Sequence, residues 1–314
     1  MTPKIAGITG PTASGKTALG VALCEKLGGE VVSADSMQIY RRMDIGTAKP
    51  TPDETRGVPH HMIDVAEPAE NWSVARYVEE AARCVEDILA RGKLPVVVGG
   101  TGLYIDSLLS GRSFAGGAVN EALRQELNER YDEIGGRGLL GELRKVDPER
   151  AEKLHVGDKK RIVRALEVFI LTGKTISQHD AETKALPPRY DAAKLALDFE
   201  DRQDLYDRID RRVEIMFARG LMDEVRALLD AGVPENCTAM QAIGYKEALD
   251  ALRGKCSEAE AMAKIQQESR RYAKRQLTWL RRDAAVEWHR FGREPDLDAA
   301  LRHSTEFLRS RGIE

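Results

Sequence analysis

A glycine-rich segment near the start of the chain has the composition of a phosphate-binding loop. Residues 10–17 read GPTASGKT, match G-x-x-x-x-G-K-[ST], and lie between a short apolar run and a helical pattern. Glycines allow backbone N–H groups to surround a phosphate, and the following helix start adds partial positive charge. A chance match in a glycine turn is the alternative. We expect a phosphorylated ligand here, with Thr17 binding Mg²⁺. The residues expected at the phosphates are Gly10, Thr12, Ala13, Ser14, Gly15, Lys16 and Thr17.

The carboxylate that an ordinary phosphate-loop NTPase uses to organise Mg²⁺ is missing from its usual place. The apolar run 95–98 leads into residues 99–102, which read GGTG. An acidic residue follows the second apolar run instead, as Asp35. Ligands of an open α/β sheet bind outside the carboxyl ends of its strands, so Asp35 and Thr101 should lie near the phosphate. Asp35 is then a candidate general base; capping a turn or binding Mg²⁺ through water remains open.

Basic residues are concentrated in a late helical segment. Residues 264–282 read KIQQESRRYAKRQLTWLRR, and at about 100° per residue the basic side chains share one broad face. Tyr272 and Trp279 flank this face, which consists of Arg270, Arg271, Lys274, Arg275, Arg281 and Arg282. Such a face suits contact with a phosphate backbone and stacking on bases, whereas the alternative is an ordinary solvated helix surface.

Two further basic clusters leave two interpretations open. Lys159, Lys160, Arg161 and Arg164 begin one helical pattern. In a second pattern, Arg208 and Arg212 are four residues apart and face the same way. They could close over a diphosphate as charge-assisted partners. Alternatively they form surface salt bridges with Asp204, Asp207 or Glu214.

The composition indicates a folded, reduced protein. The chain has 314 residues, 42% of them hydrophobic, and a formal charge of −3, which excludes a disordered chain. It contains no run of roughly 18 apolar residues and no secretory pattern, so we expect a cytoplasmic protein without a membrane segment. The four cysteines form no C-x-x-C pair, which argues against a zinc knuckle. The negative total charge does not exclude binding to nucleic acid, because the total averages over surfaces that can differ in charge.

The pattern of elements predicts an α/β fold with a mainly parallel sheet. We expect strands at 4–9, 30–33, 60–65, 94–98 and 194–199, and helices at 16–27, 73–91, 203–231 and 257–282. Between them, residues 116–183 show charged helical patterns and no convincing strand. The prediction is a phosphate-loop core like that of nucleoside triphosphate hydrolases, formed by 1–115 and 186–314. A helical insertion at 116–185 interrupts it.

Taken together, the motifs resemble the bacterial tRNA dimethylallyltransferase (tRNA isopentenyltransferase) family. They occur in the family's order and span nearly the whole chain, with weaker signals at 116–152. The matching segments are GPTASGKT (10–17), ADSMQIYRRMDIGTAKP (34–50), PVVVGGTGLY (95–104), KKRIVRALEVFILTGK (159–174), LYDRIDRRVEIMFARGLMDEV (205–225), QAIGYKE (241–247) and KRQLTWLRR (274–282).

The resemblance implies a reaction. A dimethylallyl group passes from dimethylallyl diphosphate to the exocyclic N6 amine of the adenosine 3′-adjacent to the anticodon, position 37 of tRNA. Diphosphate leaves with the help of Mg²⁺. Asp35 would be the base, and Thr101 would lie between phosphate and base. Lys16, Thr17 and Arg212 would hold the diphosphate, together with Arg208. The default oligomeric state is a monomer.

The resemblance also implies an interface with the anticodon stem-loop of tRNA, formed without a zinc finger. In the core the expected contacts are Asp35, Ser36, Met37, Gln38, Thr101, Gln241, Ala242, Ile243, Gly244, Tyr245, Lys246, Lys274, Arg275, Gln276, Leu277, Thr278, Trp279, Leu280 and Arg281. In the insertion they are Arg124, Lys160, Arg161, Ile162, Val163 and Arg164. The rival interpretations are an adenylate isopentenyltransferase, a phosphate-loop kinase of a small metabolite, and a non-catalytic RNA-binding module.

Overall fold

The computed structural model describes residues 2–111 and 120–314. The chain forms two compact units, which we call the core unit (1–109 with 189–314) and the insertion unit (110–188). The predicted first boundary, at residues 115–116, lies outside the described residues. The second, after residue 185, lies just before the end of the insertion unit at Pro188.

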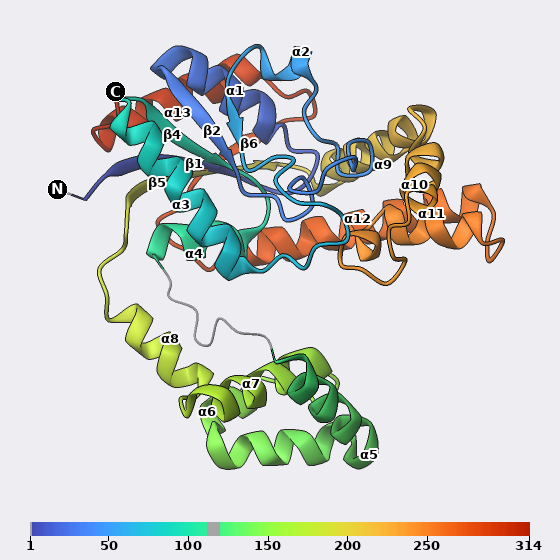
Figure 1. The fold of residues 1–314 in the computed structure, drawn as a ribbon. Coiled ribbons are helices and arrows are strands. Elements are labelled where there is room, and N and C mark those ends of the chain that lie inside the picture. Colours follow the sequence, from blue (N-terminus) through green and yellow to red (C-terminus); the bar gives the residue numbers. More distant parts are fainter. Residues whose placement is uncertain (1, 112–119) are drawn as a thin grey trace. The chain divides into compact units, whose positions relative to one another are not determined.

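A six-stranded sheet forms the centre of the core unit (Figure 1). In chain order its strands are β1 (Lys4–Thr9), β2 (Gly29–Ser33), β3 (His60–His61), β4 (Leu94–Val98), β5 (Asp191–Phe199) and β6 (Glu287–Phe291). Their order across the sheet is β3-β2-β4-β1-β5-β6, and all these pairs are parallel. The carboxyl ends of the strands therefore meet at one edge, which brings together the loops after β1, β2 and β4.

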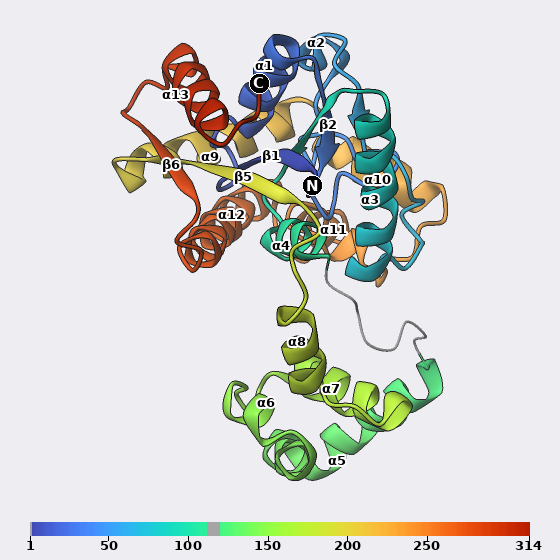
Figure 2. The same ribbon diagram turned by 90° about the vertical axis from the view of Figure 1, so that its left-hand side faces the viewer.

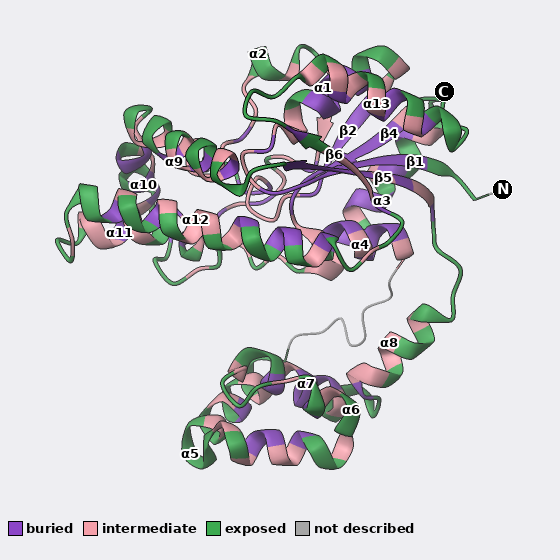
Figure 3. Ribbon diagram, turned by 180° about the vertical axis from the view of Figure 1, so that it is seen from behind, coloured by how far each residue is buried: buried purple, intermediate pink, exposed green. Residues whose placement is uncertain are grey.

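Helices cover both faces of this sheet, as its apolar strands require. Figure 2 shows α1 (Lys16–Leu27) and α13 (Leu297–Ser310) over one face, and α4 (Gly102–Ser110) and α12 (Glu258–Leu280) over the other. The side chains of Ile8 and Val96 are fully buried between these layers. The remaining helices before the insertion unit are the single-turn α2 (Pro52–Thr55) and the amphipathic α3 (Val74–Ala90). Figure 3 shows the buried residues along the strands.

The second half of the core unit differs from its prediction in several elements, and α13, described above, was among those not predicted. The single helix expected over 203–231 is two helices, α9 (Arg202–Ala218) and α10 (Leu221–Asp230). They separate at Gly220, whose φ of 94° is a left-handed conformation that favours glycine. A 3₁₀ turn (Ala239–Gln241) and α11 (Tyr245–Leu252) follow. Strand β6 was not predicted, because an edge strand reading EWHRF has little apolar alternation.

The strand predicted at 60–65 is also wrong beyond its first two residues. Only His60 and His61 pair with β2. Met62 and Asp64 have φ values of 64° and 55°, which are incompatible with an extended strand.

The described part of the insertion unit contains helices and no strand, as its charged patterns predicted. The helices are α5 (Glu121–Val146), kinked at Gly135, and α6 (Pro148–Glu152), α7 (Lys159–Thr172) and α8 (Ile176–Lys184). They bury a small core of their own that includes Leu139, Leu143 and Ile162. Among the helices described in either unit, none is long and apolar enough to cross a membrane.

Candidate active site

The loop between β1 and α1 has the backbone conformation of a phosphate cradle. Gly10, Ala13 and Gly15 have φ values of 143°, 63° and 89°. A Cβ at Gly10 would lie 2.6 Å from the carbonyl oxygen of Leu197 on β5, so only glycine lets the loop leave the sheet here. The loop then opens directly into α1, whose first N–H groups have no helical partner and point toward an anion.

Lys16 is held over this loop. Its Nζ donates a hydrogen bond to the carbonyl oxygen of Pro11 at 2.6 Å. Burial and the positive charge of Arg212 lower the pKa of Lys16 to about 7, while the Asp35 carboxylate acts in the opposite direction. A buried ammonium that lacks a full counter-charge is stabilised when an anion enters.

Two arginines of α9 reach the same loop. Arg212 donates from Nη1 to the hydroxyl of Thr12 at 3.1 Å, and Arg208 donates from Nε to the carbonyl oxygen of Ala13 at 3.1 Å. Burial lowers the pKa of both guanidinium groups. Neither forms an ion pair with a residue that the structure describes, so the salt-bridge alternative does not hold for them. They bring positive charge to the phosphate loop.

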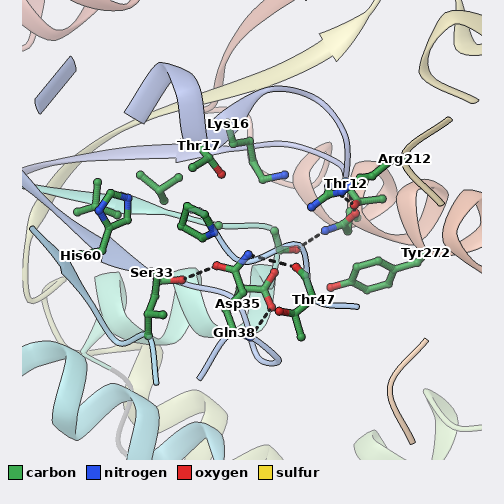
Figure 4. Close-up of a pocket in the computed structure, with 17 residues that line it drawn as sticks. Thr12, Lys16, Thr17, Ser33, Asp35, Gln38, Thr47, His60, Arg212 and Tyr272 are labelled. Carbon is green, nitrogen blue, oxygen red and sulfur yellow. Dashed lines mark hydrogen bonds between the residues drawn. The ribbon is translucent and has the colours of Figure 1, made fainter. Parts of the chain in front are cut away.

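Asp35 follows the end of β2 and lines a cavity with Lys16 and Arg212 (Figure 4). Its Oδ1 accepts hydrogen bonds from the backbone N–H of Met37 at 2.8 Å and of Gln38 at 3.3 Å. The turn-capping alternative is therefore correct for this oxygen. No described residue donates a hydrogen bond to Oδ2, and the cavity is lined by Asp35 together with Lys16 and Thr17. The cap fixes the carboxylate and leaves one oxygen for a ligand.

Thr101 joins the turn after β4 to the turn after β2. Its hydroxyl accepts from the backbone N–H of Ser36 at 3.1 Å, and its own N–H donates to the carbonyl oxygen of Ala34 at 3.1 Å. A Cβ at Gly99 would lie 2.2 Å from that same oxygen of Ala34. The glycines of the GGTG segment therefore allow its backbone to lie against that of Ala34. This places the Thr101 hydroxyl at Ser36, the residue after Asp35.

Helix α12 contributes two side chains inside the site. Gln276 is only 7% exposed; its Oε1 accepts from the N–H of Thr12 at 2.9 Å, and its Nε2 donates to the carbonyl oxygen of Gly100 at 2.9 Å. Tyr272 lines the cavity, and burial together with Asp35 raises its pKa to about 12. Gln276 was predicted as a tRNA contact; it instead bridges the phosphate loop and the GGTG turn. Tyr272 was not among the predicted site residues, although its place beside the basic face was the available signal.

A second cavity, of about 470 Å³, opens on the other side of the phosphate loop. Arg208 and Arg211 line it together with apolar side chains that include Ile215 and Met216 of α9. Four residues line both cavities: Lys16, Thr17, Pro50 and Arg212. The phosphate-binding side chains therefore lie where the two cavities approach each other.

The basic face of α12 is only partly free. Arg270 pairs with Asp210, Arg271 with Glu268 and Arg281 with Asp198, so these three match the solvated-surface alternative. Lys274 and Arg275 are exposed and form no ion pair with any described residue, and the Arg275 guanidinium lies 5.6 Å from the centre of the Tyr272 ring.

Trp279 packs inward instead of flanking a free surface. Its Nε1 donates to Asp106 of α4 at 2.7 Å, and a Cβ at Gly102 would lie 2.3 Å from its ring. Thr278, next to it, remains exposed.

Several predicted tRNA contacts have buried side chains. For Leu277 and Leu280 the helical period was the available signal, because it places them on the face opposite the basic side chains of 264–282. The buried side chains are those of Ile162, Val163, Tyr245, Leu277 and Leu280, and the backbone of Gly244 is buried as well. These side chains pack the helices, whereas Lys160, Arg161, Gln241 and Lys246 are exposed. Ala242 and Ile243 are half-buried. Arg124 and Arg164 both contact the buried Glu167, at 2.8 and 2.7 Å.

The donor groups in the cavity fit a magnesium ion that is bound largely through phosphate. The described residues contain no cluster of three or more His, Cys, Asp or Glu side chains suited to a metal. The Thr17 hydroxyl and the Asp35 carboxylate do line the phosphate cavity. Mg²⁺ commonly takes one or two protein oxygens and completes its shell with phosphate oxygens and water.

Fold and site together define an α/β protein with a phosphate loop and a carboxylate facing it. The IPP transferase family model matches residues 38–283, and an isopentenyl transferase model matches 3–69. The chain belongs to the IPP transferase family.

Named relatives agree with this assignment. A tRNA dimethylallyltransferase of Geobacter sulfurreducens is 50% identical over 91% of each chain, and one of Geobacillus thermodenitrificans is 49% identical over 92% of this chain and 90% of its own. The solved tRNA isopentenylpyrophosphate transferase of Bacillus halodurans is 40% identical with a TM-score of 0.73, covering 99% of this chain and 97% of its own. A eukaryotic dimethylallyltransferase acting on tRNA gives a TM-score of 0.83 at 30% identity, covering 99% of this chain and 81% of its own.

Proposed function

We propose that this protein transfers a dimethylallyl group from dimethylallyl diphosphate to the N6 amine of the adenosine at position 37 of tRNA, releasing diphosphate. The names of its relatives support the reaction class. The observation that carries the residue assignment is the uncapped oxygen of Asp35, which shares a cavity with the phosphate-loop side chains Lys16 and Thr17. A carboxylate in that place suits a general base that accepts a proton from the substrate better than the Mg²⁺-organising carboxylate of a nucleotide hydrolase.

The diphosphate would be bound by the backbone N–H groups of residues 10–15 and by three cations. Lys16, Arg208 and Arg212 all contact or line the loop that holds it. As the carbon–oxygen bond breaks, negative charge grows on the leaving diphosphate, and preorganised cations stabilise that charge. Mg²⁺, held through Thr17, would neutralise part of the same charge when bound.

Asp35 would act on the other reactant. The lone pair of the adenine amine is delocalised into the ring, so the amine is a weak nucleophile. As nitrogen bonds to the allylic carbon, its proton passes to the Asp35 carboxylate, a contribution of typically 10²–10⁴-fold in rate. Thr101, tied to Ser36, would keep this turn in register with the substrate.

The two cavities suggest a route for each substrate. The base would enter from the side lined by Asp35 and Tyr272, which requires its extrusion from the anticodon loop. Dimethylallyl diphosphate would enter from the side lined by Ile215 and Met216, whose apolar surface suits a prenyl chain. The tRNA backbone would be contacted by exposed basic side chains, among them Lys160, Arg161, Lys246, Lys274 and Arg275.

A comparison of two acceptors, supplied separately, tests which substrate receives the dimethylallyl group. The protein is incubated with Mg²⁺ and labelled dimethylallyl diphosphate, and either unmodified tRNA or AMP is supplied. We expect label in tRNA only. Equal labelling of AMP would instead indicate an adenylate isopentenyltransferase, and ATP turnover without tRNA would indicate a small-metabolite kinase. We also propose that the protein is cytoplasmic and a monomer. Sedimentation of the active protein measures the oligomeric state.

A further inference from the structure

A carboxylate outside the proposed catalytic residues gathers four hydrogen-bond donors. Oε2 of Glu224, on α10, accepts from the backbone N–H groups of Asp44 at 2.8 Å and Ile45 at 2.7 Å. Its Oε1 accepts from the N–H of Gly46 at 3.0 Å and from the hydroxyl of Tyr245 at 2.5 Å. Three consecutive amides are thus fixed by a single side chain that lies far away in the sequence. Hydrogen bonds to an ionised acceptor are the strong ones in proteins.

Further contacts hold the loop that Glu224 binds. Tyr245 is fully buried, and a Cβ at Gly46 would lie 2.5 Å from its ring. Burial and the neighbouring Glu224 hold the pKa of Tyr245 far above its usual range, so its hydroxyl remains a donor. The far end of the loop is tied by the buried Lys49, whose Nζ contacts the carbonyl oxygen of Tyr40 at 3.0 Å and Asp64 at 2.5 Å.

This loop determines the orientation of Gln38. The Nε2 of Gln38 donates to the carbonyl oxygen of Thr47 at 3.3 Å (Figure 4). It also donates to the carbonyl oxygen of Ala48 at 3.2 Å. Carbonyl oxygens only accept, so the nitrogen of the carboxamide must face them. The oxygen of Gln38 then faces the other way, 3.5 Å from the hydroxyl of Ser33. Gln38 lines the cavity with Asp35, and both of its donors are already used.

We propose that Glu224 is a positioning residue: through the loop 44–48 it fixes the Gln38 carboxamide as an acceptor, and so makes the site select a 6-amino purine over a 6-oxo purine. This inference rests on the proposed function. An adenine amine carries two hydrogens, one for the Asp35 carboxylate and one for the Gln38 oxygen. The oxygen of a 6-oxo purine would bring a lone pair against an acceptor, with no donor available to satisfy it.

A double-mutant cycle tests the route through Gln38. The value of kcat/KM for tRNA is measured for the wild type, Glu224→Gln, Gln38→Ala and the double variant. We expect Glu224→Gln to lower kcat/KM by about 10–100-fold with an unchanged KM for dimethylallyl diphosphate. Because both changes remove the same interaction, the double variant should equal Gln38→Ala within about twofold. Multiplying effects would show that Glu224 acts independently of Gln38 and would overturn the proposal.

Binding gives a readout that a structural role would not move. Stem-loops with adenosine or inosine at position 37 are titrated without dimethylallyl diphosphate. The wild type should prefer adenosine by about tenfold or more, and Glu224→Gln and the gentler Tyr245→Phe should reduce that ratio. An unchanged ratio in both variants would contradict the proposal. Asp223→Asn is the matched control, since Asp223 is the exposed neighbour on α10 that pairs with Arg226.

The two failures are distinguishable. If the wild type labels no tRNA, the proposed function itself fails. If the wild type labels tRNA but the cycle is multiplicative, only the role of Glu224 fails.

Discussion

At the residue scale, the site contains buried cations whose positive charge is only partly balanced by the Asp35 carboxylate. Burial lowers the pKa of Lys16, Arg208 and Arg212, and neighbouring positive charge adds to the shift at Lys16 and Arg212. Asp35 is the carboxylate that acts against this shift at Lys16. A dianionic or trianionic ligand would relieve the repulsion, so charge complementarity here is completed by the substrate.

Binding of diphosphate should therefore take up a proton. The pKa of Lys16 is about 7 in the free protein, and nearby phosphate oxygens raise it. At pH 8 the free lysine is mostly neutral and the bound lysine charged, so we expect uptake of about one proton per diphosphate. Affinity should fall as the pH rises above 7. Calorimetry in two buffers of different ionisation enthalpy measures the uptake. The same uptake in Lys16→Met would assign it to another group.

Asp35→Asn should separate binding from chemistry. The amide oxygen can still accept the N–H of Met37 and keep the turn, but the side chain cannot take the amine proton. We expect a loss of about 10²–10⁴-fold in the single-turnover rate with tRNA affinity within a few-fold of the wild type. Rapid-quench kinetics measures the single-turnover rate, and filter binding measures the tRNA affinity. A wild-type rate would remove Asp35 from the role of base.

At the element scale, glycines determine how closely α12 approaches the sheet. Gly100 leaves room for the amide of Gln276, and Gly102 leaves room for the ring of Trp279. The carboxyl edge of the sheet is thereby closed by a helix that also presents Lys274 and Arg275 outward. One helix serves the interior of the site and its surface.

Gly102→Ala should displace α12. The added Cβ would lie 2.3 Å from Cδ1 of Trp279, and overpacking of this kind costs about 1–3 kcal/mol of unfolding free energy. Denaturant unfolding measures the loss, and a matching loss of transfer activity would follow from the movement of Gln276. Gly292→Ala is the control, since nothing lies within 4 Å of its added Cβ. Equal stability of both variants would contradict the close packing.

The sequence predicted the parts of the fold and site that depend on local pattern. The phosphate loop, Asp35 at the end of β2 and the helix over 16–27 follow from spacing and periodicity alone. The break at Gly220 was missed because a single glycine within a helical pattern is ambiguous. Gln276 was expected at the tRNA and Glu224 was not expected at the site, since the contacts of both are with loops that lie far away in the chain.

At the scale of the whole molecule, negative total charge and a tRNA substrate are compatible. Acidic residues neutralise part of the basic face, as Asp210 does for Arg270. Lys274 and Arg275 remain without ion pairs among the residues described, and these are the charges that a phosphate backbone would meet. Charge left unpaired at one surface matters more for association than the sum over the chain.

Removing those charges should flatten the salt dependence of tRNA binding. Every side chain that neutralises a phosphate adds about 1 to the slope of log K against log salt, so Lys274→Ala with Arg275→Ala should reduce that slope by about 2. Binding titrations over a series of salt concentrations measure the slope. Arg83→Ala removes an arginine already paired with Glu79 on α3 and serves as the control. An unchanged slope in the double variant would assign this face to solvent.

Each transfer of a dimethylallyl group to the single target adenosine of tRNA should consume one dimethylallyl diphosphate and release one diphosphate. Unmodified tRNA, Mg²⁺ and labelled dimethylallyl diphosphate are incubated with the protein, the tRNA is digested, and the labelled nucleoside is located by mass. Released diphosphate is counted in parallel. We predict label only on the adenosine 3′-adjacent to the anticodon, in equal amount to the diphosphate released. Label elsewhere in the tRNA, or diphosphate released without modified adenosine, would contradict it.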